Sequence, residues 1–516
     1  MSFLYENIAP IAVALAVATV TWLFGGARGD LLIPVVPWIL LLLTEVLVCC
    51  PQRRHGETTY MARERMWRSL RRSPVFWTAT GFVVLLLVPF VNNGLCPGCD
   101  AELIAQGLDP RPPVSLLPFC VNRTDHLAIV LAFAVALLAA VIACHGMTDK
   151  GKRLVLELIV WNGSAVALFG FVQGAFGAPG PFWQAMAGAS AGAKGVFFSV
   201  FGYPNMAGDY FTLLFGISVA LWRDHYEESV QNESVRQADS VHSHVRRCEQ
   251  FWERHYFTLP AALFFFAAIN TLSRAAILLV TAVACICFLH TLVVLLFRMK
   301  RSRRVIVGVW SVLSLSLLVF FATIFMPDDL HREVDSLDDT ACLDRVTGKG
   351  QYHATVATAI WRDHLLFGCG GWGYKHFSVS KMEELKIPTS HVQRVGGANV
   401  HNDYLQFLAE HGLVGLGALV ALGLMLVFPV FRRWRELVRE SRFNRKQAKL
   451  PKPIALFILP APVFVLLLTA LATLVHAFGD CPLRSCAVLA LFYVLLAAMP
   501  GFLSSPTPNG SSHAAR

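Results

Sequence analysis

The chain has 516 residues, 55% of them hydrophobic and only 15% charged, and its mean hydropathy is +0.54. A soluble protein of this length carries far more charge, so this composition predicts an all-α polytopic membrane protein. The formal net charge of +10 could suit a nucleic-acid-binding protein. However, the basic residues are distributed as in the loops of a membrane protein, so we expect no nucleic-acid partner.

Apolar runs of the length that crosses a bilayer recur from end to end. They predict about twelve transmembrane helices, at Pro10–Gly26, Leu31–Cys50, Val75–Val91, Leu127–Cys144, Val155–Phe176, Met206–Trp222, Phe257–Leu272, Ala275–Phe297, Val305–Phe325, Tyr404–Phe431, Ile454–Phe478 and Leu483–Met499. No basic residue precedes the first run and no cleavage site follows it, so we expect no cleavable signal peptide.

Basic residues separate the two sides of the membrane. Five alternate loops hold 29 of the 44 Lys and Arg residues, and the opposite loops hold 14. Because basic loops stay in the cytoplasm, this asymmetry predicts cytoplasmic termini and one large extracytoplasmic loop. The expected parts are N-terminal helices (1–200), a core (201–431) with its outer loop (326–402), C-terminal helices (432–502) and a polar tail (503–516).

Seven of the thirteen cysteines fall in predicted outer segments. Cys96 and Cys99, with Cys120, could form an extracytoplasmic disulfide, and Cys481 could pair with Cys486. A redox role for the Cys-Pro-Gly-Cys stretch is disfavoured, because no thioredoxin-like βαβ pattern surrounds it.

The polar stretch around His401 lies where the long outer loop meets an apolar run. Asn399 or Asn402 could cap the helix that begins there. Spacing of four residues would place Asn402, Gln406 and Glu410 on one side of that helix. Polar groups at membrane depth are costly, so His401 is either a structural helix-start residue or a functional one.

Two further polar features are expected at the outer ends of helices. Arg274 stands almost alone in a very short turn, where its guanidinium could bind a diphosphate or merely reach lipid headgroups. Asn205 follows Pro204, and capping of a helix start would explain it.

The outer loop predicts an amphipathic helix over His353–His364, followed by a glycine-rich turn over Leu365–Gly373. The aromatic residues around this turn, Trp372 among them, could form a sugar platform or the core of a small loop subdomain. Several acidic residues precede them, but their spacing matches no calcium loop.

Together these features resemble the O-antigen ligase superfamily, which includes O-antigen polymerases and protein O-oligosaccharyltransferases. Val400–Leu416 resembles its His-Asn signature, and Ser273–Ala275 its Ser-Arg motif. Tyr203–Ala207 resembles its helix start, and Asp363–Phe377 the end of its outer loop. The resemblance spans roughly residues 200–430.

The chain departs from that pattern in two places. Leu365 and Leu366 stand where the superfamily usually has proline. The arginine that usually opens the loop helix is absent, which leaves Lys349, Arg345 and Arg394 as candidates for a second phosphate contact.

The resemblance implies metal-independent, inverting transfer of a glycan from an undecaprenyl-diphosphate-type carrier in a bacterial cytoplasmic membrane, with no cofactor. The acceptor would be a hydroxyl of lipid A–core, of another glycan or of a protein. His401 would be the general base and Arg274 the diphosphate contact, with Asn402 or Glu410 orienting the base. The alternatives are an O-antigen or exopolysaccharide polymerase and, less well supported, a polytopic transporter, for which no inverted repeat is evident.

Overall fold

The computed structural model describes residues 6–54, 56–92, 114, 116–184, 197–236, 254–298, 350–387, 399–448 and 459–503. These residues form helices and no strand, apart from one isolated bridge between Phe198 and Phe201. In chain order the main helices are α2 (Ile8–Trp22), α3 (Gly29–Cys49), α4 (Thr59–Arg71), α5 (Pro74–Leu87), α6 (Pro89–Asn92), α8 (Arg123–Val141), α9 (Asp149–Ala175), α10 (Pro204–Arg236), α12 (Thr258–Asn270), α13 (Arg274–Arg298), α17 (Gly350–Asp363), α18 (Gly373–Glu384), α20 (Asp403–Ala448), α21 (Ala461–Gly479) and α22 (Cys486–Ala498). Short helical turns are η1 (Phe24–Gly26), η2 (Ile142–Gly146), η3 (Pro181–Trp183), η6 (Pro482–Arg484) and η7 (Met499–Phe502).

The helices follow the apolar runs of the sequence. Within the described residues, seven helical segments are long and apolar enough to cross a membrane. Three shorter apolar helices, at α2, α12 and α22, lie at further predicted spans, and α10 covers the sixth. The all-helical membrane class is therefore confirmed. The predicted span Val305–Phe325 and two stretches of the long loop, 326–349 and 388–398, lie outside the described residues, so the total of twelve remains a prediction.

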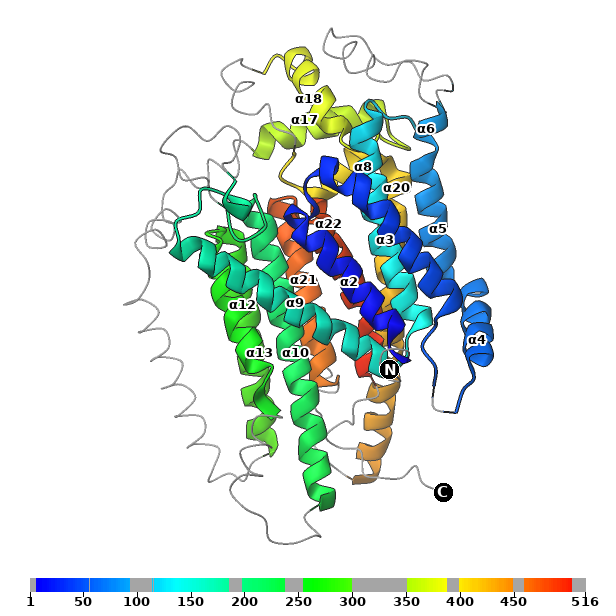
Figure 1. Cartoon of the computed structure of the whole chain (residues 1–516), viewed down its shortest axis with the longest axis vertical. Helices are drawn as coiled ribbons and strands as arrows, with labels where there is room; N and C mark the ends of the chain where they lie inside the picture. The colour runs from blue at the N-terminus through cyan, green and yellow to red at the C-terminus, as the bar shows by residue number, and fades with distance from the viewer. Residues whose placement is uncertain are drawn as a thin grey trace.

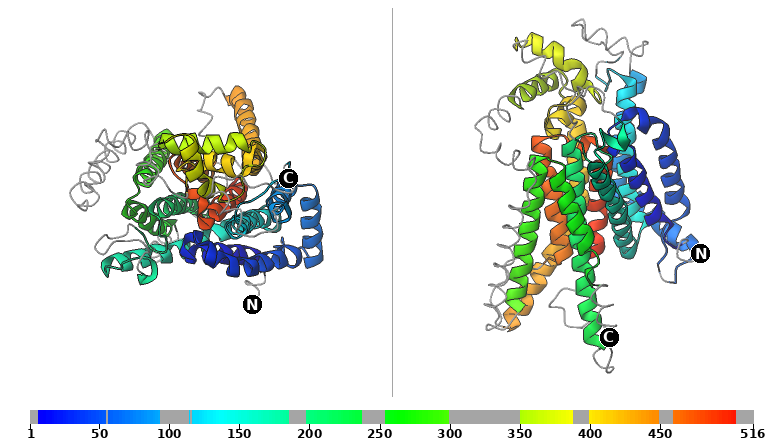
Figure 2. Two further views of the ribbon diagram at one scale, coloured as in Figure 1. Left: turned by 90° about the horizontal axis from the view of Figure 1, so that it is seen from above. Right: turned by 60° about the vertical axis from the view of Figure 1, so that its left-hand side comes forward.

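Helix α22 lies at the centre of the bundle. Every one of its residues is buried, because the helix is apolar on all sides. It contacts α8, α10, α20, α21, α2 and α9, and the view from above in Figure 2 shows it enclosed by the other helices. The C-terminal helices therefore form part of the core.

The surrounding helices form two groups on opposite sides of α22. Figure 1 shows α12 and α13 beside α10 on one side, and α3, α5 and α8 on the other. Helices α17 and α18 of the outer loop lie at one end of the bundle, and the basic helix α4 lies toward the other end. This arrangement agrees with the predicted separation of basic loops from the long loop.

Helix α20 is interrupted at Gly412, whose φ of +63° and ψ of −169° are not helical. Because of the interruption, some main-chain N–H and C=O groups have no hydrogen-bond partner within the helix. Residues 365–370 of the preceding loop provide these partners. The amides of Cys369 and Gly370 donate to carbonyls of the first part of α20, over 3.0 and 2.8 Å. The amides of Leu413 and Val414 donate to carbonyls of residues 365 and 366, both over 3.0 Å. The glycine-rich turn therefore continues the bonding of a broken helix, as backbone at membrane depth requires.

The glycines in α20 differ in what surrounds them. At Gly412 the close neighbour is the loop, since an added Cβ would lie 2.2 Å from the carbonyl oxygen of Leu366. At Gly417 an added Cβ would meet nothing within 4 Å. Gly412 therefore cannot be replaced by a larger residue without a clash with the loop, whereas Gly417 has space for a side chain.

The expected pairing of Cys481 with Cys486 is wrong, because both are free and buried. The thiol of Cys481 donates to Oε1 of Gln406 over 3.3 Å, whereas Cys486 packs against Gly26. The turn η6 separates the two residues and directs them to different neighbours. Cys120 is buried, and Cys96 and Cys99 lie outside the described residues.

Candidate active site

The start of α20 holds His401 in a constrained position. Asn402 caps the helix, since its Oδ1 accepts from the amide of Leu405 over 3.0 Å, and its Nδ2 donates to the carbonyl of Phe478 over 3.1 Å. His401 itself has a φ of +55°, which is rare for a residue with a side chain. Its side chain is 49% exposed. The capping role predicted for this region therefore belongs to Asn402, and His401 presents its ring to the outside.

Asp480 lies against the ring of His401, and the hydroxyl of Tyr203 is 3.5 Å from Nδ1 of the same ring. Asp480 follows α21, and its Oδ1 lies 3.3 Å from Nδ1 of His401. The amide of Cys481 also donates to Oδ1, over 2.7 Å, and the hydroxyl of Tyr203 donates to Oδ2 over 2.8 Å. Asn205 donates a further hydrogen bond through Nδ2. Asp480 is nearly buried, so these donors fix its carboxylate against the imidazole.

The helix start of α10 supplies two of these donors. Burial and the neighbouring Asp480 carboxylate raise the pKa of the Tyr203 hydroxyl, so the phenol stays protonated and donates. Asn205 bonds to Tyr203 over 3.1 Å as well as to Asp480. Capping of α10 therefore does not explain Asn205, because its side chain reaches across to the end of α21.

A second histidine lies beside the first. The ring centroid of His353, on α17, is 5.7 Å from that of His401. Nδ1 of His353 lies 2.7 Å from the hydroxyl of Tyr374, on α18. The outer-loop helices therefore contribute one wall of the region around His401.

Arg274 begins α13 after a turn of three residues, as predicted. This turn packs on α10 at Gly208, where an added Cβ would lie 3.1 Å from Oγ1 of Thr271 and 3.2 Å from Cβ of Ser273. Leu272, within the turn, has a φ of +57°. Arg274 is half-buried. It therefore lies on a turn fixed against the same helix that carries Asn205.

A comparison with protein families indicates what kind of protein carries this polar cluster. Residues 259–420 match the family model described as O-antigen ligase. The chain is a member of the O-antigen ligase superfamily. The matched segment includes both Arg274 and His401, and the chain is thus a membrane enzyme of the O-antigen ligase and polymerase type. No curated protein matches the chain.

Two residues of the cluster around His401 lie outside the segment that matches the O-antigen ligase family. Asp480 comes about eighty residues after His401, and Tyr203 precedes the segment. The only sequence signal for Asp480 is a single carboxylate between the last two apolar runs, and that signal does not say what it faces. The contact with His401 depends on the packing of the end of α21 beside the start of α20.

The remaining predicted site residues are placed as follows. Lys349, Arg345 and Arg394 lie outside the described residues. Trp372 lies at the start of α18, where its amide donates to Oε2 of Glu410 over 3.1 Å and its ring centroid lies 4.9 Å from Cζ of Arg484. Within the part of the chain that the structure describes, no group of three or more His, Cys, Asp or Glu residues could hold a metal ion.

Glu410 does not reach His401 through any contact in the structure. Gln406 and Glu410 do lie on one side of α20, as their spacing predicted, and Nε2 of Gln406 donates to Oε1 of Glu410 over 3.1 Å. Glu410 forms an ion pair with the buried Arg484. The carboxylate that orients His401 is therefore Asp480.

Proposed function

We propose that this protein is an O-antigen ligase-type glycosyltransferase of the bacterial cytoplasmic membrane. It moves a glycan from an undecaprenyl-diphosphate-type carrier to an acceptor hydroxyl at the outer face. The observation that carries the proposal is the half-exposed imidazole of His401 with its Nδ1 against the buried carboxylate of Asp480, 3.3 Å away. A histidine oriented by a carboxylate is suited to remove a proton from a hydroxyl.

The reaction follows from this pair. Asp480 accepts from Nδ1–H of His401, which leaves Nε2 as the ring nitrogen that takes the acceptor proton. The acceptor oxygen then forms a bond to the anomeric carbon, while the bond from that carbon to the diphosphate oxygen breaks with its electron pair. Attack from the face opposite the leaving group inverts the configuration. The imidazolium that forms is stabilised by the Asp480 carboxylate.

The departing diphosphate gains negative charge, and Arg274 is the residue proposed to stabilise it. A guanidinium donates two parallel hydrogen bonds to phosphate oxygens. The turn that carries Arg274 packs on α10, and α10 also donates to Asp480 through Tyr203 and Asn205. Lys349, Arg345 and Arg394 remain candidates for a second phosphate contact.

A polymerase would use the same chemistry with another glycan repeat as acceptor, so it is the alternative within this proposal. A transporter is less well supported, because the polar residues described above gather at the end of the bundle that carries α17 and α18 (Figure 1). Transport would need a polar path to the other end.

The test is a reconstituted assay with purified lipid-linked glycan and a lipid A–core acceptor. His401→Asn is the informative variant, because asparagine tolerates the left-handed backbone of this position but cannot take a proton. We expect turnover to fall by roughly 10²–10⁴-fold, the usual contribution of a general base, with unused donor accumulating.

Asp363→Asn is the matched control, since it changes an outer-loop carboxylate whose ion pair is with Lys381, away from His401. It should keep normal turnover. Near-normal transfer by a folded His401→Asn protein would refute the mechanism.

A further inference from the structure

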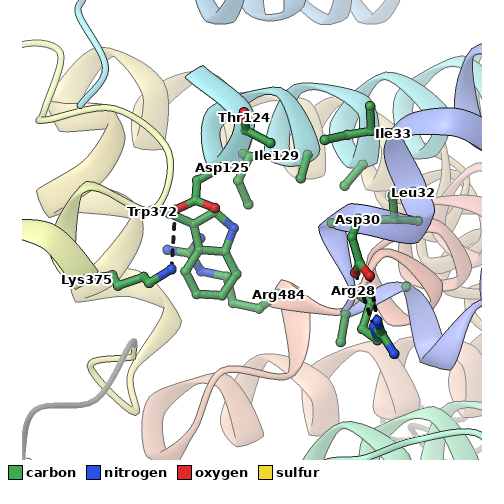
Figure 3. Close-up of a pocket in the computed structure, with 15 residues that line it drawn as sticks. Arg28, Asp30, Leu32, Ile33, Thr124, Asp125, Ile129, Trp372, Lys375 and Arg484 are labelled. Atoms are coloured by element: carbon green, nitrogen blue, oxygen red, sulfur yellow. Dashed lines mark hydrogen bonds and ion pairs between the residues drawn. The ribbon is translucent and has the colours of Figure 1, made fainter. Parts of the chain in front are cut away.

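A cavity of about 460 Å³ has Arg484, the last residue of η6, in its lining. It is enclosed by the start of α3, the first turns of α8 and the start of α18 (Figure 3). The side chains that line it include Thr124, Asp125, Trp372, Lys375 and Arg484. None of these residues has a part in the transfer step proposed above.

The guanidinium of Arg484 lines this cavity with N–H groups that lack hydrogen-bond acceptors in the described part of the chain. The side chain of Arg484 is 1% exposed and forms an ion pair with Glu410, but its Nε and Nη1 have no hydrogen-bond partner among the described residues. Buried donors are normally paired, and this guanidinium lines the cavity. A ligand with oxygen acceptors would satisfy it.

The charges around the cavity are balanced. Arg28 pairs with Asp30, Lys375 lies 3.4 Å from Asp125, and Arg484 pairs with Glu410. Each cation therefore already has a carboxylate, so the cavity offers no excess positive charge to attract a diphosphate. Paired carboxylates, ammonium and guanidinium groups still accept and donate hydrogen bonds, which suits the hydroxyls of an uncharged sugar.

Trp372 adds an aromatic surface to these polar groups. Figure 3 shows its indole ring beside the Asp125–Lys375 pair, and Cζ of Arg484 lies 4.9 Å from the ring centroid. Trp372 has a φ of +59°, an outlier for a bulky residue, and the hydrogen bond from its amide to Glu410 helps to hold it there. An amphipathic ring beside paired charges can cover the C–H face of a sugar while the charged groups bond its hydroxyls.

We propose that this cavity binds an uncharged sugar ring of the acceptor substrate. The inference rests on the proposed function, which requires an acceptor opposite the leaving diphosphate. Arg274 lies with α12 and α13 on one side of α22, whereas the cavity lies with α3 and α8 on the other (Figure 1). Asp480, which orients the base, precedes Arg484 by four residues, so their Cα atoms are at most roughly 14 Å apart.

Sugar binding can be measured on the full-length protein without transfer, by saturation-transfer NMR with neutral trisaccharides of glucose, galactose and mannose. We expect a signal from at least one of them in the wild type and in His401→Ala. Trp372→Ala should weaken binding about tenfold, as the loss of one well-placed contact does. Thr124→Trp should have a similar effect, because the new side chain fills the cavity from an exposed position. Thr44→Trp is the matched control, because Thr44 is an exposed α3 residue outside the cavity, and should bind normally.

The outcomes separate this proposal from the proposed function. If no trisaccharide binds, or if Thr124→Trp binds as well as the wild type, the acceptor cavity is refuted even when His401→Ala abolishes transfer. If binding behaves as expected while His401→Ala still transfers normally, the mechanism fails and the sugar site stands. Binding of inorganic diphosphate that Thr124→Trp removes would also overturn the proposal, because the cavity would then be a donor site.

Discussion

The contact between Asp480 and His401 allows us to predict how far two substitutions of Asp480 lower the rate of transfer. In Asp480→Asn the new NH₂ group cannot take the place of Oδ1, because the amide of Cys481 donates to that position over 2.7 Å. The asparagine oxygen must therefore stay there, facing Nδ1 of His401, and the NH₂ group takes the place of Oδ2. The Tyr203 hydroxyl must then turn, and the Asn205 amide flip, so that their oxygens accept from it, which the main-chain amide of Cys481 cannot do. The histidine keeps its tautomer and loses only the negative charge beside it.

The expected decrease in kcat for each substitution follows from this geometry. A hydrogen bond to a charged group is worth about 1.5–3 kcal/mol and a neutral one about 1 kcal/mol. Asp480→Asn should therefore lower kcat roughly tenfold, which corresponds to about 1.4 kcal/mol. Asp480→Ala removes both orientation and charge, so kcat should fall by about 10²-fold or more.

The measurement is kcat in the reconstituted transfer assay, with the Tm of each purified variant as the check on folding. Asp480→Ala also leaves the Tyr203 hydroxyl without an acceptor, so its Tm should fall. Tyr203→Phe provides the comparison for that effect, because it removes the hydroxyl and leaves the carboxylate next to His401. Wild-type kcat in Asp480→Ala would refute the assignment of Asp480 as the residue that orients the base.

Three other predictions concern the diphosphate contact, the broken helix and the topology. Arg274→Ala should abolish transfer and Arg274→Lys should restore it poorly, because a point charge cannot make the two-bond fork; wild-type activity of the alanine variant would leave Arg274 with a lipid-headgroup role. Gly412→Ala should destabilise the fold by about 2 kcal/mol or more in a thermal-shift assay, through its positive φ and the nearby carbonyl, whereas Gly417→Ala should be neutral or stabilising. On a cysteine-depleted background, a cysteine at Glu383 should react with an impermeant probe on intact cells and one at Glu440 only after lysis; labelling of both from one side would refute the topology.

Local patterns in the sequence were sufficient for much of the fold. The short turn before Arg274, the helix over His353–His364 and the helix start after Asn402 were all predicted correctly, because each depends on neighbouring residues. Apolar length likewise located the spans that the structure describes.

Partners that come from distant segments could not be predicted in this way. Asp480 and His401 are far apart in the sequence, and their contact depends on how α21 packs beside α20. The same limit explains the error for Cys481 and Cys486, whose short separation suggested a disulfide although η6 turns them to different neighbours. Asn205 looked like a cap because its cross-helix partner was unknown.

The bonding of residues 365–370 to the interrupted helix α20 also has a consequence for the order of folding. The four main-chain hydrogen bonds that join them form only when both halves of α20 and the loop are in place. This end of the outer loop therefore acquires its fold together with the break in α20, and the amides of Cys369 and Gly370 should exchange with solvent about as slowly as those of the helix itself. It belongs to the cooperative unit of the bundle, although in sequence it is part of a loop.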